Sequence, residues 1–203
     1  MSLPLASATR IGPVEFISVF DDDLARPVLP VGPEPLPDED PEAFEERALV
    51  FKQECEAYEK AAQAFHRRMK AARETQSWDD VLKPEADPVI FVCKPIEYEA
   101  MEALEGERRH LESDLAMAGL LLRMSLVEIR GPAFAGFKVP PLAPHTRPDP
   151  DTKRAVVTGI GKVAPPSMLK DIARRVANGE LAKAVIRDIG LQILNHWERA
   201  PVP

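Results

Sequence analysis

Residues 40–74 constrain the fold more than any other stretch, because their apolar and small residues recur at alternating spacings of four and three without a break. A repeat that averages 3.5 residues keeps one stripe of an α-helix facing a neighbouring helix along its whole length. The stretch therefore predicts a long helix with a continuous packing seam. The seam consists of Phe44, Ala48, Phe51, Cys55, Tyr58, Ala62, Phe65, Met69 and Ala72.

The residues at both ends of this stretch favour the same helix bounds. Asp40 suits the N-cap and Pro41 the first helical position, and glutamates follow near the positive end of the helix dipole. The far end carries a basic cluster, which suits the negative end of the dipole: His66, Arg67, Arg68, Lys70 and Arg73. The alternative for this cluster, contact with nucleic acid, is disfavoured by the net charge of −7.

A second stripe of small apolar side chains runs beside the seam at a spacing of seven residues. A single helical hairpin would leave this stripe uncovered, so we interpret it as a candidate protein–protein interface. Its members are Val50, Ala57, Ala64 and Ala71. Trp197 is either a core residue or a further interface candidate, because tryptophan is usually largely buried but also leads among interface anchors.

A second long helix is predicted from residue 95 to about residue 123, with the same three-and-four spacing. Its seam consists of Met101, Leu104, Arg108, Leu111, Leu115, Ala118 and Leu122. Arg108 is the one charged member, and it either lies over the apolar stripe from the helix edge or meets Glu54 or Glu56 across an antiparallel pair. The two seams together predict a long antiparallel helical hairpin.

Four segments rich in β-branched and apolar residues predict short strands: 14–20, 89–93, 125–131 and 154–161. The strand at 89–93 is expected to pair with 14–20 or with a later strand. Two proline-rich segments, 26–41 and 132–166, are expected to be extended, because proline fixes φ and removes a backbone donor. Two further helices are predicted at the C-terminal end, at 167–178 and 180–199.

These elements predict a mainly α fold with a small β element (α+β) that contains the long hairpin, proline-rich extended arms and a C-terminal helical pair. The expected divisions are an N-terminal strand and arm at 1–41, a helical hairpin core with a buried strand at 42–131, a proline-rich extended segment at 132–166, and the helical pair at 167–203.

Composition narrows the classes of function. The acidic net charge argues against nucleic acid as a partner. The N-terminus lacks a charged start followed by a sustained apolar stretch, and nowhere do 18 apolar residues run together, so we expect no membrane partner and a protein that is cytoplasmic at synthesis. Cys55 and Cys93 have the character of small core residues in a reducing compartment.

No motif in the sequence predicts catalysis or the binding of a metal or cofactor. Asp21–Asp23 lack the alternating ligands and the glycine of a calcium loop. GIGK at 159–162 fails as a phosphate loop, because Val156 stands where the first glycine belongs and Val163 follows the lysine. The histidines have no metal-ligand spacing: they are His66, His110, His145 and His196. We therefore expect no catalytic, metal or cofactor site, and a protein that is not an enzyme.

The strand DPVIFVCKPI leads directly into an acidic helix, and the later segment MAGLLLRMSLVEIRG ends in a glycine. In outline, this order resembles the tail-assembly and virion accessory proteins of tailed bacteriophages. The resemblance covers about residues 87–131 and rests on the layout of the elements, with the long heptad helix outside it. It implies a non-catalytic structural or assembly protein, in the tail or virion, whose partners are other protein subunits of an oligomer or larger assembly.

Two other functions stay open from the residues alone. One is a soluble inhibitor or regulator that binds a single protein target through the acidic surface, and the other is an enzyme with an unrecognised site. The number of subunits in the complex separates an inhibitor or regulator from an assembly protein. An inhibitor binds one target at a fixed low stoichiometry, whereas an assembly protein enters an oligomer or larger complex.

Overall fold

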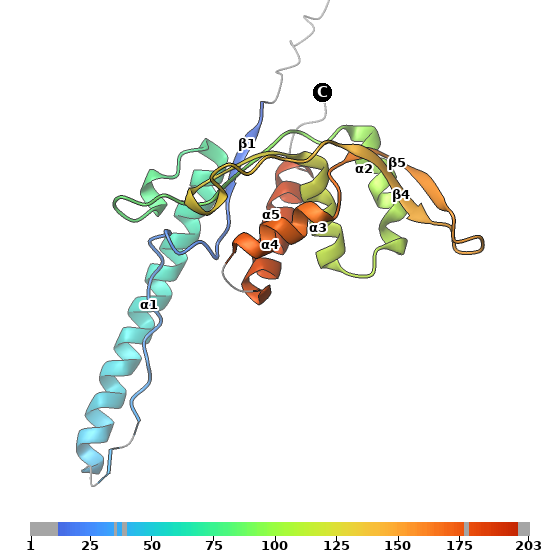
Figure 1. The fold of residues 1–203 in the computed structure, drawn as a ribbon. Coiled ribbons are helices and arrows are strands. Elements are labelled where there is room, and N and C mark those ends of the chain that lie inside the picture. The colour runs from blue at the N-terminus through green and yellow to red at the C-terminus, as the bar shows by residue number, and fades with distance from the viewer. Residues whose placement is uncertain (1–11, 35, 38–39, 177–178, 199–203) are drawn as a thin grey trace, which may run out of the picture. The chain divides into compact units, whose positions relative to one another are not determined.

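The computed structural model describes residues 12–34, 36–37, 40–176 and 179–198 of the chain (Figure 1). The chain divides into two compact units, of which unit 1 is built from residues up to Asp22 and from Asp87 onward, and unit 2 from Asp23–Ala86. Helices together with two small antiparallel sheets confirm the predicted α+β class. The described residues contain no helix with both the length and the apolar character of a bilayer span.

The predicted strands of unit 1 come together in a three-stranded antiparallel sheet. It consists of β1 (Val14–Ile17), β2 (Ile90–Cys93) and β3 (Leu126–Arg130), with β2 in the centre. Phe91 of β2 lies opposite Phe16 on one side and opposite Ile129 on the other, and all three side chains are buried. The strand predicted at 89–93 therefore pairs both with the strand predicted at 14–20 and with a later strand.

The predicted continuous helix from 95 to 123 is wrong. The segment forms α2 (Tyr98–Glu107), a 3-10 turn η2 (Arg108–His110) and α3 (Asp114–Ser125). Ser113 starts α3 as its N-cap, because its Oγ accepts the backbone N–H of Ala116 at 3.2 Å. Gly106 weakens the preceding turn of α2, since glycine is a poor helix former. The heptad spacing thus continues across the break between α2 and α3, although Ser113 caps a new helix there.

Of the two roles expected of Arg108, the position over the apolar stripe agrees with the structure, because Arg108 lines a cavity together with Met101 and Leu104. Arg108 lies at the end of α2, its side chain is exposed, and its Nη1 is 3.4 Å from Glu105 Oε1 one turn earlier on the same helix. The antiparallel hairpin is also not confirmed, because the first long helix belongs to unit 2, whereas α2 and α3 belong to unit 1.

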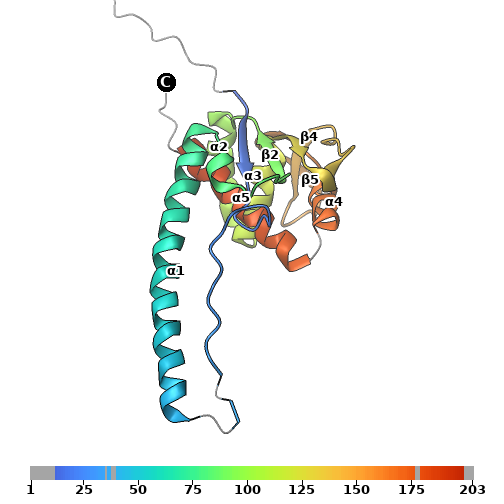
Figure 2. The ribbon, with the colours of Figure 1, turned by 90° about the vertical axis from the view of Figure 1, so that its left-hand side faces the viewer.

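Helix α3 is the central element of unit 1, and nearly every residue of its second half is buried. It packs along α5 (Gly179–Glu198), and α4 (Ser167–Arg175) also packs on α5 (Figure 2). These two helices are the predicted C-terminal pair, whose residues 177, 178 and 199 lie outside the described part of the chain. The backbones of α3 and α5 approach closely at Gly190, where an added Cβ would lie 2.5 Å from the Cα of Ala118.

The segment 132–166 is not one extended excursion. After a 3-10 turn η3 (Pro132–Phe134), it forms a hairpin of β4 (Ala143–Pro148) and β5 (Ala155–Val163), and β5 packs against α2. Asp149 fixes the turn, because its Oδ1 accepts the backbone N–H of Thr152 at 2.7 Å and that of Asp151 at 3.0 Å. β5 corresponds to the strand predicted at 154–161. Its partner β4 was not predicted, because β4 contains prolines, which are unusual in strands.

A polar tie fastens the first strand of unit 1 to its last helix. Asp188 Oδ2 on α5 accepts hydrogen bonds from Ser18 Oγ at 3.0 Å, from the backbone N–H of Val19 at 2.8 Å and from Gln192 Nε2 at 2.9 Å. Gln192 Nε2 also donates to the backbone oxygen of Ile17 at 3.1 Å. The end of β1 is therefore held by a side chain that lies 170 residues further along the chain.

Two interior helix glycines, Gly190 and Gly106, provide a matched test of the α3–α5 crossing. We expect Gly190→Ala to lower the free energy of unfolding by about 1–3 kcal/mol or more, because its Cβ would overlap the backbone of Ala118. Gly106→Ala has no atom within 4 Å of its added Cβ, so it should raise the free energy by up to about 1 kcal/mol. Urea unfolding followed by circular dichroism measures both, and equal effects would contradict the close crossing.

Candidate protein-interaction surface

Unit 2 is organised around α1 (Pro41–Thr75), the long helix that the seam predicts. Asp40 is its N-cap as expected, with Oδ1 accepting the backbone N–H of Glu42 at 3.1 Å. The seam residues are the least exposed stripe of the helix, but burial is complete only near its C-terminal end, at Phe65, Met69 and Ala72. The seam is therefore buried from Phe65 to Ala72, and its earlier residues are half-buried.

Short segments on either side of α1 in the sequence are joined at the base of unit 2. Leu24 and Leu82 form an antiparallel bridge, and the backbone N–H of Ala25 donates to the oxygen of Val81 at 2.8 Å. The 3-10 turn η1 (Asp79–Val81) packs against α1, and Arg68 Nη1 donates to the backbone oxygen of Asp80 at 3.1 Å. The buried apolar residues of unit 2 are Leu24, Phe65, Met69, Ala72, Trp78 and Val81.

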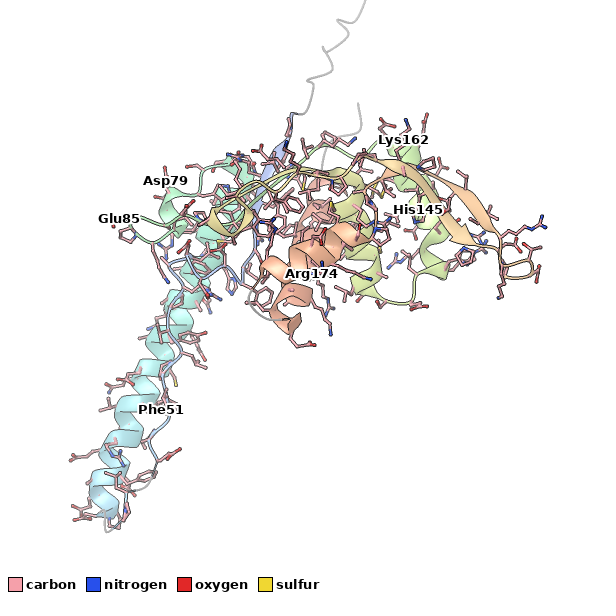
Figure 3. The ribbon with its side chains drawn as sticks, in the orientation of Figure 1. Phe51, Asp79, Glu85, His145, Lys162 and Arg174 are labelled. Carbon is pink, nitrogen blue, oxygen red and sulfur yellow. The ribbon has the colours of Figure 1, made fainter. Side chains whose placement is uncertain are left out.

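The proline-rich arm, residues 26–37, runs along α1 in both views of the ribbon, with residue 35 outside the described part of the chain (Figures 1 and 2). A Cβ added at Gly32 would lie 3.5 Å from the ring of Phe51, an ordinary van der Waals distance, so the arm passes beside the seam at this residue. Figure 3 labels Phe51 on α1. Arg47 Nη2 donates to the backbone oxygen of Glu34 at 2.9 Å. The chain's own arm therefore contacts the first half of α1 at Phe51 and Arg47.

Large apolar side chains are exposed on the arm and on the first turns of α1. Val28 is 88% exposed and Val31 90% exposed. Single exposed apolar residues are normal, but a concentration of large ones in neighbouring parts of the chain is a candidate interaction site. We name this group the arm surface. Its residues are Val28, Leu29, Val31, Leu36, Leu49 and Val50.

The predicted interface residues of α1 lie on an accessible face of the helix. Val50 is 54% exposed, Ala57 and Ala71 are exposed, and Ala64 is half-buried. Trp197 lies within α5, but its side chain is outside the described part of the chain. The structure brings the α1 residues together on one helix, and their role as an interface stays a prediction.

The charges of α1 are separated along its length. In residues 41–57 glutamates outnumber lysines and arginines by five to two, and in residues 58–75 the ratio is reversed. This order favours the helix, because each sign lies near the end of the dipole that attracts it. It also gives the exposed face of α1 an acidic half and a basic half.

A second polar site, which we name the hairpin cluster, lies in unit 1 between the β4–β5 hairpin and α2. Arg147 Nε is 2.9 Å from Glu107 Oε2, and both side chains are largely buried. His145, which Figure 3 labels, has its Nδ1 2.8 Å from Thr158 Oγ1, and this hydroxyl also lies 3.3 Å from the backbone oxygen of His145. The hydroxyl of Thr158 has one proton to donate, so which partner donates in the 2.8 Å contact follows the tautomer of the imidazole.

The remaining candidate residues for chemistry are dispersed. His66 and His110 are exposed, and His196 packs edge-on against Phe16 with ring centroids 5.9 Å apart. Asp21 Oδ2 accepts the backbone N–H of Val89 at 2.9 Å, which explains one of the three successive aspartates as a loop cap. The described residues contain no group of three or more His, Cys, Asp or Glu that could hold a metal ion.

Neither cysteine forms a disulfide. Cys93 is buried in β2, and burial raises the pKa of its thiol to about 12 despite a hydrogen bond with Ser125. A thiol with this pKa stays protonated at neutral pH and is a poor nucleophile. Cys55 is half-buried in the seam of α1, as the packing interpretation of that residue expects.

Two cavities of unit 1 are large enough for a small ligand or an anchoring side chain. One, of about 290 Å³, is lined by Lys94, Glu97, Ile160 and Lys162 among others. The other, of about 260 Å³, lies between α2, α3 and α5 and has an apolar floor of Met101, Met117 and Leu194. The sequence marked none of these residues as a site, and no histidine lines either cavity.

No protein-family model, curated protein or solved structure matches the chain. The interpretation of the arm surface therefore rests on its own geometry.

The uneven burial of the seam predicts a graded response to truncation. We expect Met69→Ala to lower the free energy of unfolding of unit 2 by about 2–5 kcal/mol, because Met69 is fully buried. Tyr58→Ala should cost less, about 1–2 kcal/mol, since Tyr58 is half-buried and loses less apolar area. In a Trp197→Phe background, Trp78 is the only tryptophan, so its fluorescence reports unit 2. A larger loss for Tyr58→Ala would show that the seam is covered more fully than the contacts indicate.

The hairpin cluster predicts a pH dependence of stability. Burial, and then the charge of Arg123, lower the pKa of His145 below its usual 6.5, and Glu107 opposes this shift. A histidine whose folded-state pKa is lowered binds its proton more readily when unfolded, so stability falls as pH drops below about 7. The urea midpoint should therefore decrease between pH 7.5 and 5.5, and His145→Gln should make this decrease smaller. An unchanged decrease would contradict the burial of His145.

Proposed function

We propose that this chain is a non-catalytic structural or assembly protein that acts through protein–protein contacts, like the tail and virion accessory proteins of tailed bacteriophages that its layout resembles. The observation that carries the proposal is the arm surface, with its large apolar side chains in water. The proposed partners are other protein subunits, and the proposed locations are the cytoplasm at synthesis and then the virion. The proposal includes no cofactor, nucleic acid or membrane.

The energetics of α1 support a partner for this surface. Helices gain most of their stability from packing an amphipathic face. In the first half of α1 no residue is fully buried, so the arm supplies only part of the expected cover. Each Å² of apolar surface removed from water contributes about 25 cal/mol, so a protein that covered Leu49, Val50 and the arm would stabilise the complex.

The arm has the stiffness that a binding element needs. Prolines 27, 30, 33 and 37 restrict φ along the segment. A chain that is already extended loses less conformational entropy when it binds, and this raises affinity for a given contact area. The exposed Val28 and Val31 lie between these prolines, so they are displayed on a stiff segment.

The candidate interface residues fall into the same proposal. Val50 belongs to the arm surface, and Ala57, Ala64 and Ala71 continue along α1 from it. Trp197 is proposed as a separate contact residue near the C-terminal end. A helical hairpin between α1 and residues 95–123 is not part of the proposal, because those residues form two shorter helices.

Light scattering after size exclusion tests the proposal with the full chain, alone and with the products of neighbouring genes. We expect the chain to enter an oligomer or large complex with structural proteins. Val28→Asp combined with Val31→Asp should weaken that complex at least tenfold, because it places two charges in an apolar contact. The matched control is Val157→Asp on β5, which is exposed in unit 1 and should leave the complex intact.

Two results would contradict the proposal. A chain that stays monomeric with all of these proteins would exclude an assembly role. A complex with a single target at one-to-one stoichiometry would favour the inhibitor or regulator that the acidic sequence leaves open.

A further inference from the structure

A cavity of about 260 Å³, which we name the helix cavity, lies in unit 1 between α2, α3 and α5. Its lining is mostly apolar, and it ranges from fully buried residues to Leu191, which is 42% exposed. The cavity therefore opens to solvent, where a small molecule can enter it. Its large apolar side chains are those of Met101, Leu104, Met117, Leu121, Leu191 and Leu194.

The close crossing of α3 and α5 explains why the protein's own side chains leave this space open. Gly190 and Ala118 both line the cavity, and the crossing requires Gly190 to lack a side chain, because its Cβ would lie 2.5 Å from the Cα of Ala118. The two smallest residues of the lining therefore stand where α3 and α5 meet. The apolar groups around the open space lack contacts that a filled core would provide, and a ligand would supply them.

The charged residues of the lining are all paired. Arg108 Nη1 is 3.4 Å from Glu105 Oε1, and Asp114 Oδ2 is 3.5 Å from Arg187 Nη2. The other residues that line the cavity carry apolar side chains or, at Gly190, none. A polar ligand would lose its hydrogen bonds to water in such a site without replacing them. The lining therefore favours a ligand that is uncharged and apolar.

The volume of the helix cavity and its two methionines narrow the class of ligand further. An apolar cavity of about 150 Å³ is enough to bind benzene. The helix cavity is larger, so it has room for one aromatic ring with a small substituent or for two fused rings. Met101 on α2 and Met117 on α3 both line it, and a thioether makes favourable contacts with aromatic rings on a side chain that adapts its shape.

We propose that the helix cavity binds a small uncharged aromatic molecule, in contact with Met101 and Met117. The cavity and the arm surface belong to different units of the chain, so this inference does not rest on the proposed function. Arg108, the one charged residue of the seam predicted at 101–122, lies at the edge of the site, where Glu105 neutralises its charge.

Nuclear magnetic resonance of the full chain, labelled with ¹³C at the methyl groups of its six methionines, tests the proposal with toluene as the probe. We expect saturable shifts of the Met101 and Met117 signals, caused by the ring current of the bound toluene. Met69 of unit 2 and Met124, which lines the other cavity of unit 1, should keep their signals. Single Met→Leu variants assign the spectrum. Unchanged Met101 and Met117 signals up to the solubility limit of toluene, or equal shifts at Met124, would overturn the proposal.

Variants that fill the cavity test the location of the bound ring. Met117→Phe should raise the Kd for toluene about tenfold or more, because the added ring occupies space that the ligand needs. Leu191→Trp, at the exposed part of the lining, should also weaken binding without disturbing the buried core. The matched control is Val157→Phe on β5, an exposed position outside the cavity, which should leave the Kd within about twofold. Unchanged binding in both filled variants, with circular dichroism showing an intact fold, would place the site elsewhere and contradict the proposal.

Analogues of toluene with similar size test the chemical class. Phenol, benzoate and protonated benzylamine should each bind about tenfold more weakly than toluene, because the cavity offers no unpaired group to replace their contacts with water. If benzoate bound more tightly than toluene, and Arg108→Gln removed that difference, the site would be one for anions. That result would overturn the assignment of an uncharged ligand.

Discussion

The close crossing of α3 and α5 is the constraint on which unit 1 depends. Gly190 and Ala118 bring the two backbones together, and the second half of α3 is then enclosed on nearly every side. A helix that is apolar all round must be buried, so α3 requires the sheet, α4, α5 and the β4–β5 hairpin around it. The hydrogen bonds that Asp188 of α5 accepts from Ser18 and Val19 hold the end of β1 against this group of elements. Unit 2 has no such central helix, and among its described residues the fully buried ones lie at one end of α1 and in the segments joined there.

Local signals in the sequence predicted the elements that depend on local chemistry. Asp40, Pro41 and the unbroken seam specify α1, and the short β-branched runs specify β1, β2, β3 and β5. The break between α2 and α3 was missed because Leu111 continues the apolar spacing, whereas the capping of Ala116 by Ser113 decides the helix boundary. Strand β4 was missed because Pro144 and Pro148 argue against a strand unless it lies at an edge.

The candidate surface was predicted in part. The spacing of Val50, Ala57 and Ala71 placed them on one face of a helix, and their exposure follows from that geometry. The contact between Gly32 and Phe51 was not predictable, because a glycine between prolines carries no periodic signal for what lies beside it. The hairpin cluster was missed for a related reason: Glu107, Arg147 and Thr158 are distant in sequence, and their pairing depends on the fold of the β4–β5 hairpin.

The prolines of β4 also limit how copies of this chain can join. A strand at the edge of a sheet usually offers backbone donors to any extended segment that meets it, and such contacts can repeat without end into fibres. Pro144 and Pro148 have no N–H to offer, so β4 is a poor template for an added strand. Two copies of the chain are therefore poorly suited to extend the β4–β5 hairpin through β4, because an added strand would lose two backbone hydrogen bonds there.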